Sequence, residues 1–224
     1  MDRMRLNKFL ATSGFCSRRK ADSLIEEKQV LVNGQVANLG DKVGKNDIVT
    51  VDNHKISLPT TFHYFVIYKP KNVITTLADE QGRDSIANYL PKGLNLFPVG
   101  RLDRNSEGLL ILTDDGDFAN QLIHPSNNHQ KVYELWARKS SKTTNIEARE
   151  IESKFIKGFK IDGTLMKADK SEIFKSEQKF FKMYLTLSTG YNRQIRKMCD
   201  KIGYSAIKLI RIQIGKVALK DLNI

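Results

Sequence analysis

The stretch 100–113, GRLDRNSEGLLILT, joins a charged loop to an apolar run with the composition of a buried strand. Asp103 stands between Arg101 and Arg104, and two glycines bracket the loop. The apolar run 109–112 marks the entry to a hydrophobic core. A carboxylate held between two guanidinium groups at the edge of a core is either an ordinary loop ion pair or part of a site. The rest of the chain has to decide between these two interpretations.

Composition narrows the class of protein. The chain has 224 residues, 40% of them hydrophobic, enough for one medium domain and a small one. Lys and Arg number 37 against 25 Asp and Glu, a net charge of +12, which favours a polyanionic partner, nucleic acid before an anionic membrane. No apolar run approaches the ~18 residues of a membrane span, and the apolar stretch near the N-terminus is too short for a signal peptide. We therefore expect a cytoplasmic protein.

The sequence offers no motif for a metal or a nucleotide cofactor. Cys16 and Cys199 lie far apart and predict free thiols rather than a zinc site or a disulfide. The histidines lack metal-ligand spacing, and HExxH, GxGxxG and GxxxxGK[ST] do not occur. The acidic run 114–117 has no glutamate where a calcium loop needs its last ligand, so it predicts a turn in which Asp117 caps a helix over 118–123. We expect chemistry without a cofactor and without a metal.

The first fifty residues predict two short helices followed by a small sheet. Apolar residues of 5–11 share one helical face, Gly14 ends that helix, and Ser17 is an N-cap for the next. An Asn-Gly pair predicts a hairpin over 30–36, and 47–51 has the pattern of a further strand.

The second helix begins with an unusual first turn. Arg18, Arg19 and Lys20 place three cations where the helix macrodipole favours anions, at a cost of about a few tenths of a kcal/mol each. A phosphate docked at this N-terminus would be contacted by backbone N–H groups and by all three cations. The alternative is a solvated charged turn.

The polar segment 53–61 contains Pro59 and lacks periodicity, which predicts a linker between a domain over 1–52 and a second domain over 62–224. The second domain is expected to be α+β with a mainly antiparallel mixed sheet flanked by helices. Strands are predicted at 65–68, 109–112, 132–137, 182–187 and 218–219, with a turn at 69–72.

A helix near the C-terminus carries the second candidate site residue. Asn192 is predicted to cap it, its apolar residues recur at i, i+3, i+4 and i+7 from Ile195, and Gly203 ends it. Arg196 lies at the border of the apolar face, where a guanidinium can reach a partly buried partner, whereas Lys197 points away from that face.

Three segments resemble the RsuA/RluB/RluE/RluF group of bacterial ribosomal RNA pseudouridine synthases. They are FPVGRLDRNSEGLLILTDDGDFANQL at 97–122, HQKVYELWA at 129–137 and TGYNRQIRKMCDKIGYSAIKLIRIQIGKVAL at 189–219. The segment RLNKFLATSGFCSRRKADSLI, followed by VLVNGQ, resembles an S4-like (αL) RNA-binding domain. GFCSRRKAD and GYNRQIRKMC are most similar to the RluF branch, whose substrate is 23S ribosomal RNA.

The resemblance implies an isomerase that converts a uridine in RNA to its C-glycoside without a cofactor. It implies that Asp103 is the essential aspartate, that Arg196 is its partner and that Tyr133 stacks on the uracil. The carboxylate must be ionised whether it adds to C1′ or removes a 2′ proton, and both routes stay open. The chain has Asn72 where many members carry glycine and Tyr191 where many carry arginine, and Asn tolerates the left-handed backbone of such a turn.

The expected partner is 23S ribosomal RNA or an assembling large subunit, bound by a monomer. A small-subunit site or a tRNA is an alternative substrate. A non-catalytic RNA-binding assembly factor and a hydrolase that releases free uracil are alternative functions. Residues expected to contact RNA are Arg5, Lys8, Arg18, Arg19, Lys20, Arg101, Arg104, Lys131, Asn192, Arg193 and Lys197.

Overall fold

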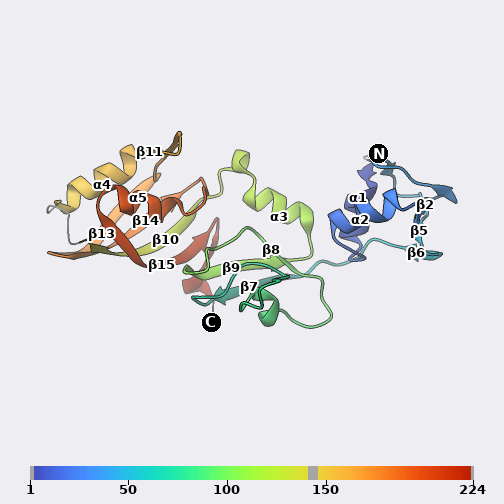
Figure 1. Cartoon of the computed structure of the whole chain (residues 1–224), viewed down its shortest axis with the longest axis horizontal. Coiled ribbons are helices and arrows are strands. Elements are labelled where there is room, and N and C mark those ends of the chain that lie inside the picture. Colours follow the sequence, from blue (N-terminus) through green and yellow to red (C-terminus); the bar gives the residue numbers. More distant parts are fainter. Residues whose placement is uncertain (1–2, 141–145, 223–224) are drawn as a thin grey trace. The chain divides into compact units, whose positions relative to one another are not determined.

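The structure, a computed structural model, describes residues 3–140 and 146–222, without the side chain of Pro125. It divides the chain into two compact units, and Figure 1 shows the elements of both. One unit runs to Tyr64 and includes the short segments Gly93–Leu96 and Thr113–Gly116, and the other contains the remaining residues. Among the residues so described, no helix is long and apolar enough to cross a membrane.

The first unit contains the two helices and the small sheet that the sequence predicts. Its elements are β1 (Met4–Arg5), α1 (Leu6–Thr12), α2 (Arg18–Glu26), β2 (Val30–Val32), β3 (Gln35–Val36), β4 (Lys42–Val43), β5 (Val49–Val51) and β6 (His54–Ile56). Ser17 caps α2, since its Oγ accepts a hydrogen bond from the Lys20 backbone N–H at 3.2 Å. Asn33 and Gly34 adopt φ of 52° and 79°, as a two-residue hairpin requires.

The sheet of the first unit extends further along the chain than the sequence suggested. Its order is β3-β2-β5-β6, and β6 lies inside the polar segment 53–61 that was expected to be a linker. Asp52 and Asn53 have φ of 48° and 63°, so this polar pair makes a hairpin turn rather than an open connection. The domain boundaries at 52 and 62 stay predictions.

The second unit is built on one large sheet. Its strands are β7 (Tyr64–Lys69), β8 (Phe97–Pro98), β9 (Glu107–Thr113), β10 (Lys131–Lys139), β11 (Phe159–Ile161), β12 (Thr164–Met166), β13 (Lys170–Glu177), β14 (Phe180–Leu187), β15 (Tyr204–Ile214) and β16 (Val217–Ala218). Its helices are α3 (Gly116–Ile123), α4 (Ala148–Lys157) and α5 (Gln194–Lys201), with 3-10 turns at Ile86–Tyr89, Pro125–Asn127 and Leu219–Asp221. Helix α3 begins at Gly116, two residues before the predicted start, so the prediction that Asp117 caps it is wrong, because Asp117 already lies in the first turn.

The large sheet has the order β13-β14-β10-β15-β9-β7, with β8 beside β9 and β16 beside β15. β10 runs antiparallel to β14 and β15, whereas β15 and β9 run parallel. The α+β class with a mainly antiparallel mixed sheet is therefore confirmed.

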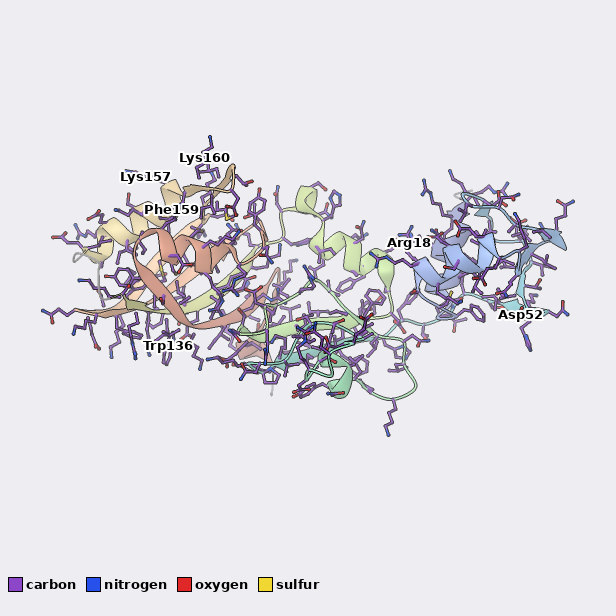
Figure 2. All side chains as sticks on the ribbon, viewed as in Figure 1. Arg18, Asp52, Trp136, Lys157, Phe159 and Lys160 are labelled. Atoms are coloured by element: carbon purple, nitrogen blue, oxygen red, sulfur yellow. The ribbon has the colours of Figure 1, made fainter. Side chains whose placement is uncertain are left out.

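Helices α4 and α5 cover one face of the β13-β14-β10-β15 half of this sheet, as Figure 1 shows. Phe155 of α4 and Met198 of α5 pack there against Leu135 and Met183 of the strands, all of them buried. Trp136 alternates with Leu135 along β10 and points away from the helices (Figure 2). The apolar period of two in β10 thus decides which face of the sheet receives the helices.

Candidate active site

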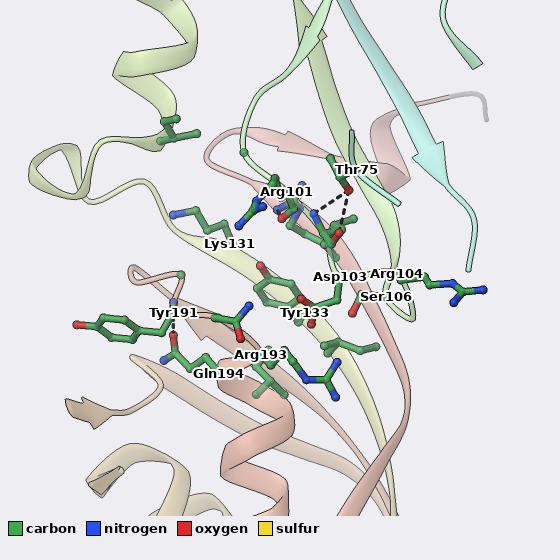
Figure 3. Close-up of a pocket in the computed structure, with 18 of the residues that line it drawn as sticks. Thr75, Arg101, Asp103, Arg104, Ser106, Lys131, Tyr133, Tyr191, Arg193 and Gln194 are labelled. Carbon is green, nitrogen blue, oxygen red and sulfur yellow. Dashed lines mark hydrogen bonds between the residues drawn. The ribbon is translucent and has the colours of Figure 1, made fainter. Parts of the chain in front are cut away.

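A cavity of about 790 Å³ opens in the second unit where the loop before β9, the start of β10 and the N-terminal end of α5 converge. Asp103, Tyr133 and Arg196 all line it. Figure 3 shows Asp103 and Tyr133 near its centre, with Lys131 and Arg101 on one side and Arg193 and Gln194 on the other. The structure thus brings together three residues that are separated by up to ninety-three positions in the sequence.

The loop that carries Asp103 has its backbone held from several directions. Its five successive carbonyls accept hydrogen bonds from Arg211 Nη1 (Arg101 O, 3.4 Å), Thr75 Oγ1 (Leu102 O, 2.8 Å), the Ser106 N–H (Asp103 O, 3.0 Å), the Asn72 N–H (Arg104 O, 2.8 Å) and Arg196 Nη2 (Asn105 O, 2.7 Å). Figure 3 marks the two bonds between Thr75 and Leu102. With every acceptor satisfied, the fold itself fixes the backbone of the loop at Asp103.

Arg196 approaches Asp103 from α5. Its Nε lies 3.8 Å from Asp103 Oδ2, and the two side chains are 11% and 28% exposed. Nη1 donates to Ala206 O at 2.9 Å, and Nη2 also donates to Ser106 Oγ at 3.2 Å. Burial lowers the pKa of Arg196, whereas Asp103 raises it. Nε makes no hydrogen bond to any residue that the structure describes, so the guanidinium keeps one donor beside the carboxylate.

The start of α5 differs from the prediction. Asn192 was expected to cap the helix, but the N-cap residue is Arg193, in a left-handed conformation with φ of 53° and no side-chain cap. The side chain of Gln194, the first residue of the helix, instead bonds the loop before it. Its Oε1 accepts hydrogen bonds from the Tyr191 N–H at 3.2 Å and from Thr189 Oγ1 at 3.1 Å. The left-handed residue inserts one position between Asn192 and the helix, which sequence periodicity does not reveal.

Tyr133 lies near the start of β10, half-buried. It is in register with Leu185 of β14 on one side and Arg211 of β15 on the other, next to a β-bulge between Val132 and Tyr133. Bulges re-aim side chains beside active sites, and here the ring of Tyr133 lines the cavity.

Lys69 is a buried cation that the sequence analysis treated only as part of a turn. Its side chain is fully buried at the end of β7, and Nζ donates to Val73 O at 2.7 Å, Pro70 O at 2.9 Å and Arg104 O at 3.5 Å. Burial lowers its pKa to about 8, although Glu107 and Asp103 raise it. The signal in the sequence was a lysine ending the apolar run of residues 65–68, where a strand enters the core.

The turn after Lys69 contacts the loop that carries Asp103. Asn72 adopts a φ of 70°, the left-handed backbone expected for a position that is often glycine. Its N–H and the Nζ of Lys69 both bond Arg104 O. The substitution of asparagine for glycine therefore leaves the turn intact.

Arg211 was also missed. It is 3% exposed on β15, Nε donates to Leu109 O at 2.9 Å, and it lines the cavity. The signal was an arginine two positions after Leu209 in an alternating apolar strand, because that spacing places both side chains on the core face.

The RNA-contact residues predicted in the second unit divide into two groups. The residues that line the cavity are Arg101, Arg104, Lys131, Asn192 and Arg193. Among them, Arg104 points away from Asp103 in Figure 3 and donates through Nε to Asn72 O at 3.3 Å. Lys197 lies outside the cavity and pairs with Asp162 at 2.7 Å.

Lys131 differs from Arg101, Arg104 and Arg193 in its burial. It is half-buried, and Nζ donates to Ser188 O at 3.4 Å. Burial lowers its pKa, Arg211 lowers it further, and Asp169 raises it. Lys131 and Arg211 therefore place two interacting basic groups in the lining of the cavity.

The remaining predicted contacts belong to the first unit. Arg18, Arg19 and Lys20 form an exposed first turn of α2, and Figure 2 labels Arg18. Arg5 lines a hollow that also contains the carboxylates of Asp22, Glu26 and Asp41, and Lys8 is half-buried on α1. The roles of all these residues stay predictions.

The described part of the chain contains no cluster of three or more His, Cys, Asp or Glu side chains that could hold a metal ion. A second carboxylate does line the cavity, that of Asp79. Arg83 binds it through Nη2 at 2.6 Å, and these hydrogen bonds lower the pKa of the carboxyl group. Asp79 is therefore an ionised partner of Arg83 rather than a proton donor.

Comparison with known proteins identifies the family of the chain. Residues 63–201 match the RNA pseudouridylate synthase family, and residues 4–49 match the S4 domain. The dual-specificity RNA pseudouridine synthase RluF of Escherichia coli (strain K12) is 36% identical over 226 residues, which cover 98% of this chain and 72% of RluF. The ribosomal large subunit pseudouridine synthase B of Bacillus subtilis (strain 168) is 35% identical over 98% of this chain and 88% of its own length.

A solved pseudouridylate synthase shares the fold, with a TM-score of 0.65 and 23% identity over 98% of this chain and 93% of that structure. The family match covers more than half of the chain, and both relatives align with nearly all of it. The chain belongs to the RNA pseudouridylate synthase family and carries an S4 domain at its N-terminal end.

Proposed function

We propose that this chain converts a specific uridine of 23S ribosomal RNA to pseudouridine, with Asp103 as the catalytic carboxylate. The relatives named RluF and ribosomal large subunit pseudouridine synthase B support an RNA substrate of this kind. The observation that carries the assignment to Asp103 is its place in the cavity, on a loop with every carbonyl bonded and with Arg196 Nε at 3.8 Å.

The reaction requires the N-glycosidic bond to break, the uracil to turn over while it is held, and its C5 to bond to C1′ of the ribose. Asp103 either adds to C1′ and is displaced by C5, or removes the 2′ proton to give a glycal that C5 then attacks. Both routes start from an ionised carboxylate, and the guanidinium of Arg196 lies beside it, with Nε 3.8 Å from Asp103 Oδ2.

Tyr133 supplies the surface for the extruded base. A uridine must leave its stack to reach Asp103, which costs a few kcal/mol, and stacking on an aromatic ring returns about 1–3 kcal/mol. The hydroxyl of Tyr133 is the group we assign to help remove the C5 proton at the end of the reaction.

A hydrolase is the weaker alternative. Glycoside hydrolysis uses two carboxyl groups, one of which donates a proton. The second carboxylate in the cavity, Asp79, is engaged by Arg83. An isomerase needs no activated water, which suits a site with one available carboxylate.

The test is release of tritium from 23S RNA that carries 5-tritiated uridine, with the parent protein and its Asp103→Asn variant side by side. We expect release by the parent and none by the variant, while both bind RNA equally well. Free uracil in the products would favour the hydrolase. Tight RNA binding without release, on free RNA and on assembly intermediates alike, would favour the assembly factor.

We propose further that the S4 domain binds a structured part of the same RNA and that the enzyme acts as a monomer. The relative RluF is described as dual-specificity, so the same assay with tRNA in place of 23S RNA decides whether this chain also accepts a second substrate. Sedimentation measures the oligomeric state.

A further inference from the structure

Arg211 is a buried cation to which the proposed mechanism gives no task. It is 3% exposed, and both of its hydrogen bonds go to backbone carbonyls, Nε to Leu109 O at 2.9 Å and Nη1 to Arg101 O at 3.4 Å. Taking a guanidinium out of water is costly unless its donors are used. The positions of those two carbonyls indicate the role of the buried guanidinium.

The two carbonyls belong to opposite arms of the loop that carries Asp103. Arg101 lies two residues before Asp103, and Leu109 lies six residues after it, inside β9. A single planar guanidinium therefore ties the arm that enters the loop to the arm that leaves it.

The main chain of Arg211 is fixed against the same loop. In the parallel pairing of β15 with β9, Arg211 is in register with Gly108. A Cβ added to Gly108 would lie 2.3 Å from Arg211 O and 2.8 Å from Arg211 N, so the two backbones are in direct contact. The side chain of Arg211 thus starts from a point that cannot shift relative to the exit arm.

On the other side, Arg211 is in register with Tyr133 across the antiparallel pairing of β15 with β10. The strand position of Arg211 therefore lies between the strand that carries the aromatic ring and the loop that carries the carboxylate. A side chain of different length at position 211 would therefore change the distance between the Tyr133 ring and the Asp103 carboxylate.

We propose that Arg211 is a positioning residue, which sets the distance between Asp103 and Tyr133 by holding both arms of the catalytic loop. This proposal rests on the proposed function for its catalytic consequence. Arg196 bonds the same loop at Asn105 O, between the two carbonyls that Arg211 bonds. The two arginines therefore hold different parts of the loop.

Lysine cannot replace arginine in this role, because an ammonium group lacks the planar fork that reaches two separated carbonyls. We expect Arg211→Lys to lower the single-turnover rate constant at saturating RNA by about 10²-fold, the size of effect that a misplacement of roughly 1 Å produces. Arg211 lines the cavity, but both of the hydrogen bonds that it makes go to carbonyls of the chain itself, so the dissociation constant for RNA should stay within about threefold.

A second variant guards against simple loss of folding. Arg211→Met removes the buried charge and keeps much of the side-chain length, but it leaves the carbonyls of Arg101 and Leu109 without this donor, at a cost of about 1–3 kcal/mol for each buried acceptor. It should unfold at a lower temperature than the parent, stay folded at the assay temperature and still show the reduced rate constant. Phe155→Leu is the matched control, because Phe155 is fully buried in the α4 core and does not line the cavity. It should lower the unfolding temperature and leave the rate constant of the folded enzyme unchanged.

Hydrogen exchange of residues 100–109 tests the positioning without turnover. We expect faster exchange of these amides in Arg211→Met and parent-like exchange in Phe155→Leu. Unchanged exchange in Arg211→Met overturns the proposal, even if the parent enzyme releases no tritium and the proposed function itself fails. Faster exchange together with a parent-like rate constant overturns the catalytic consequence.

Discussion

At the scale of single residues, the site combines side chains whose tasks can be separated by substitution. Asp103 and Arg196 form an ion pair with 3.8 Å between Oδ2 and Nε, and Tyr133, to which we assign two roles, brings a ring and a hydroxyl to the same cavity. Because one residue carries two of these functions, a pair of variants at Tyr133 is more informative than one.

We predict that Tyr133→Phe keeps the stacking of the base and that Tyr133→Leu loses it. The loss of about 1–3 kcal/mol of stacking should reduce formation of the extruded state by about 5- to 150-fold. Fluorescence of 2-aminopurine placed next to the target uridine reports extrusion in both variants. If Tyr133→Phe extrudes the base normally but releases tritium slowly, the hydroxyl acts on the C5 proton, whereas normal release assigns Tyr133 to stacking alone.

Gly108 is the residue whose replacement we expect to be most damaging to the loop. It has a φ of 104°, and its Cβ would collide with the backbone of Arg211, so Gly108→Ala should lower the free energy of unfolding by about 2 kcal/mol or more. Gly116→Ala is the control, because a Cβ at Gly116 meets nothing within 4 Å. Urea denaturation measures both. Equal stability of the two variants would contradict the close approach of β9 and β15.

Residue-level predictions succeeded where the sequence expressed a local rule. The helical wheel placed Arg196 at the border of an apolar face, and the structure places it beside Asp103. Arg211 escaped notice because the carbonyl that its Nε bonds is 102 positions away in sequence. Lys69 bonds two nearby carbonyls, but its third partner, Arg104 O, is 35 positions away. No periodicity in a single chain reveals such partners.

At the scale of elements, periodicity and turn chemistry predicted most strands and helices. β10 and α5 were found because their apolar periods are clear, and β2–β3 because Asn33 and Gly34 form a hairpin turn. Strand β6 was missed because the turn before it, Asp52-Asn53, has the composition of a linker. The start of α5 was displaced by the left-handed Arg193, a tertiary effect that propensity does not record.

The contribution of Lys69, at the end of β7, to the stability of the chain should depend on pH. The pKa of Lys69 in the folded chain is about 8, below its ordinary 10.5, because of burial. Between these two values the unfolded chain holds a proton that the folded chain has lost, so the contribution of Lys69 to stability rises with pH. Below about pH 8 both states are protonated and the contribution is constant.

We therefore predict that the parent gains stability relative to Lys69→Met between pH 8 and pH 10, by roughly 2 kcal/mol. Urea denaturation of both proteins at pH 7.5 and pH 9.5 measures the difference. A difference that stays constant, or that shrinks as the pH rises, would show that the charged lysine is the form that the carbonyls stabilise.

At the scale of the whole molecule, the excess of positive charge is the property that the sequence revealed most directly. The net charge of +12 indicated a nucleic-acid partner before any motif was considered, and the matches to an S4 domain and an RNA-modifying family agree with it. Composition could not show which cations face RNA. Of those predicted, Lys197 is paired with Asp162, and Arg5 lies beside three carboxylates.

We predict that replacing Arg18, Arg19 and Lys20 together with glutamine flattens the salt dependence of RNA binding. The slope of log K against log salt should fall by about 0.7 to 0.9 for each phosphate contact that is lost. Changing Lys157, Lys160 and Lys170 to glutamine removes the same charge from the second unit and serves as the control. Equal slopes in the two triple variants would mean that the turn at the start of α2 is only solvated.

The fully bonded carbonyls of the Asp103 loop have a consequence for how the enzyme uses its substrate. Ordering a loop of this length at the moment of binding would cost about 1–2 kcal/mol per residue in backbone entropy. Here that entropy is lost when the chain folds, because Thr75, Asn72, Arg196 and Arg211 already hold the loop. The free energy gained from binding RNA is then available for extruding the uridine from its helix, a step to which a fixed aspartate does not contribute.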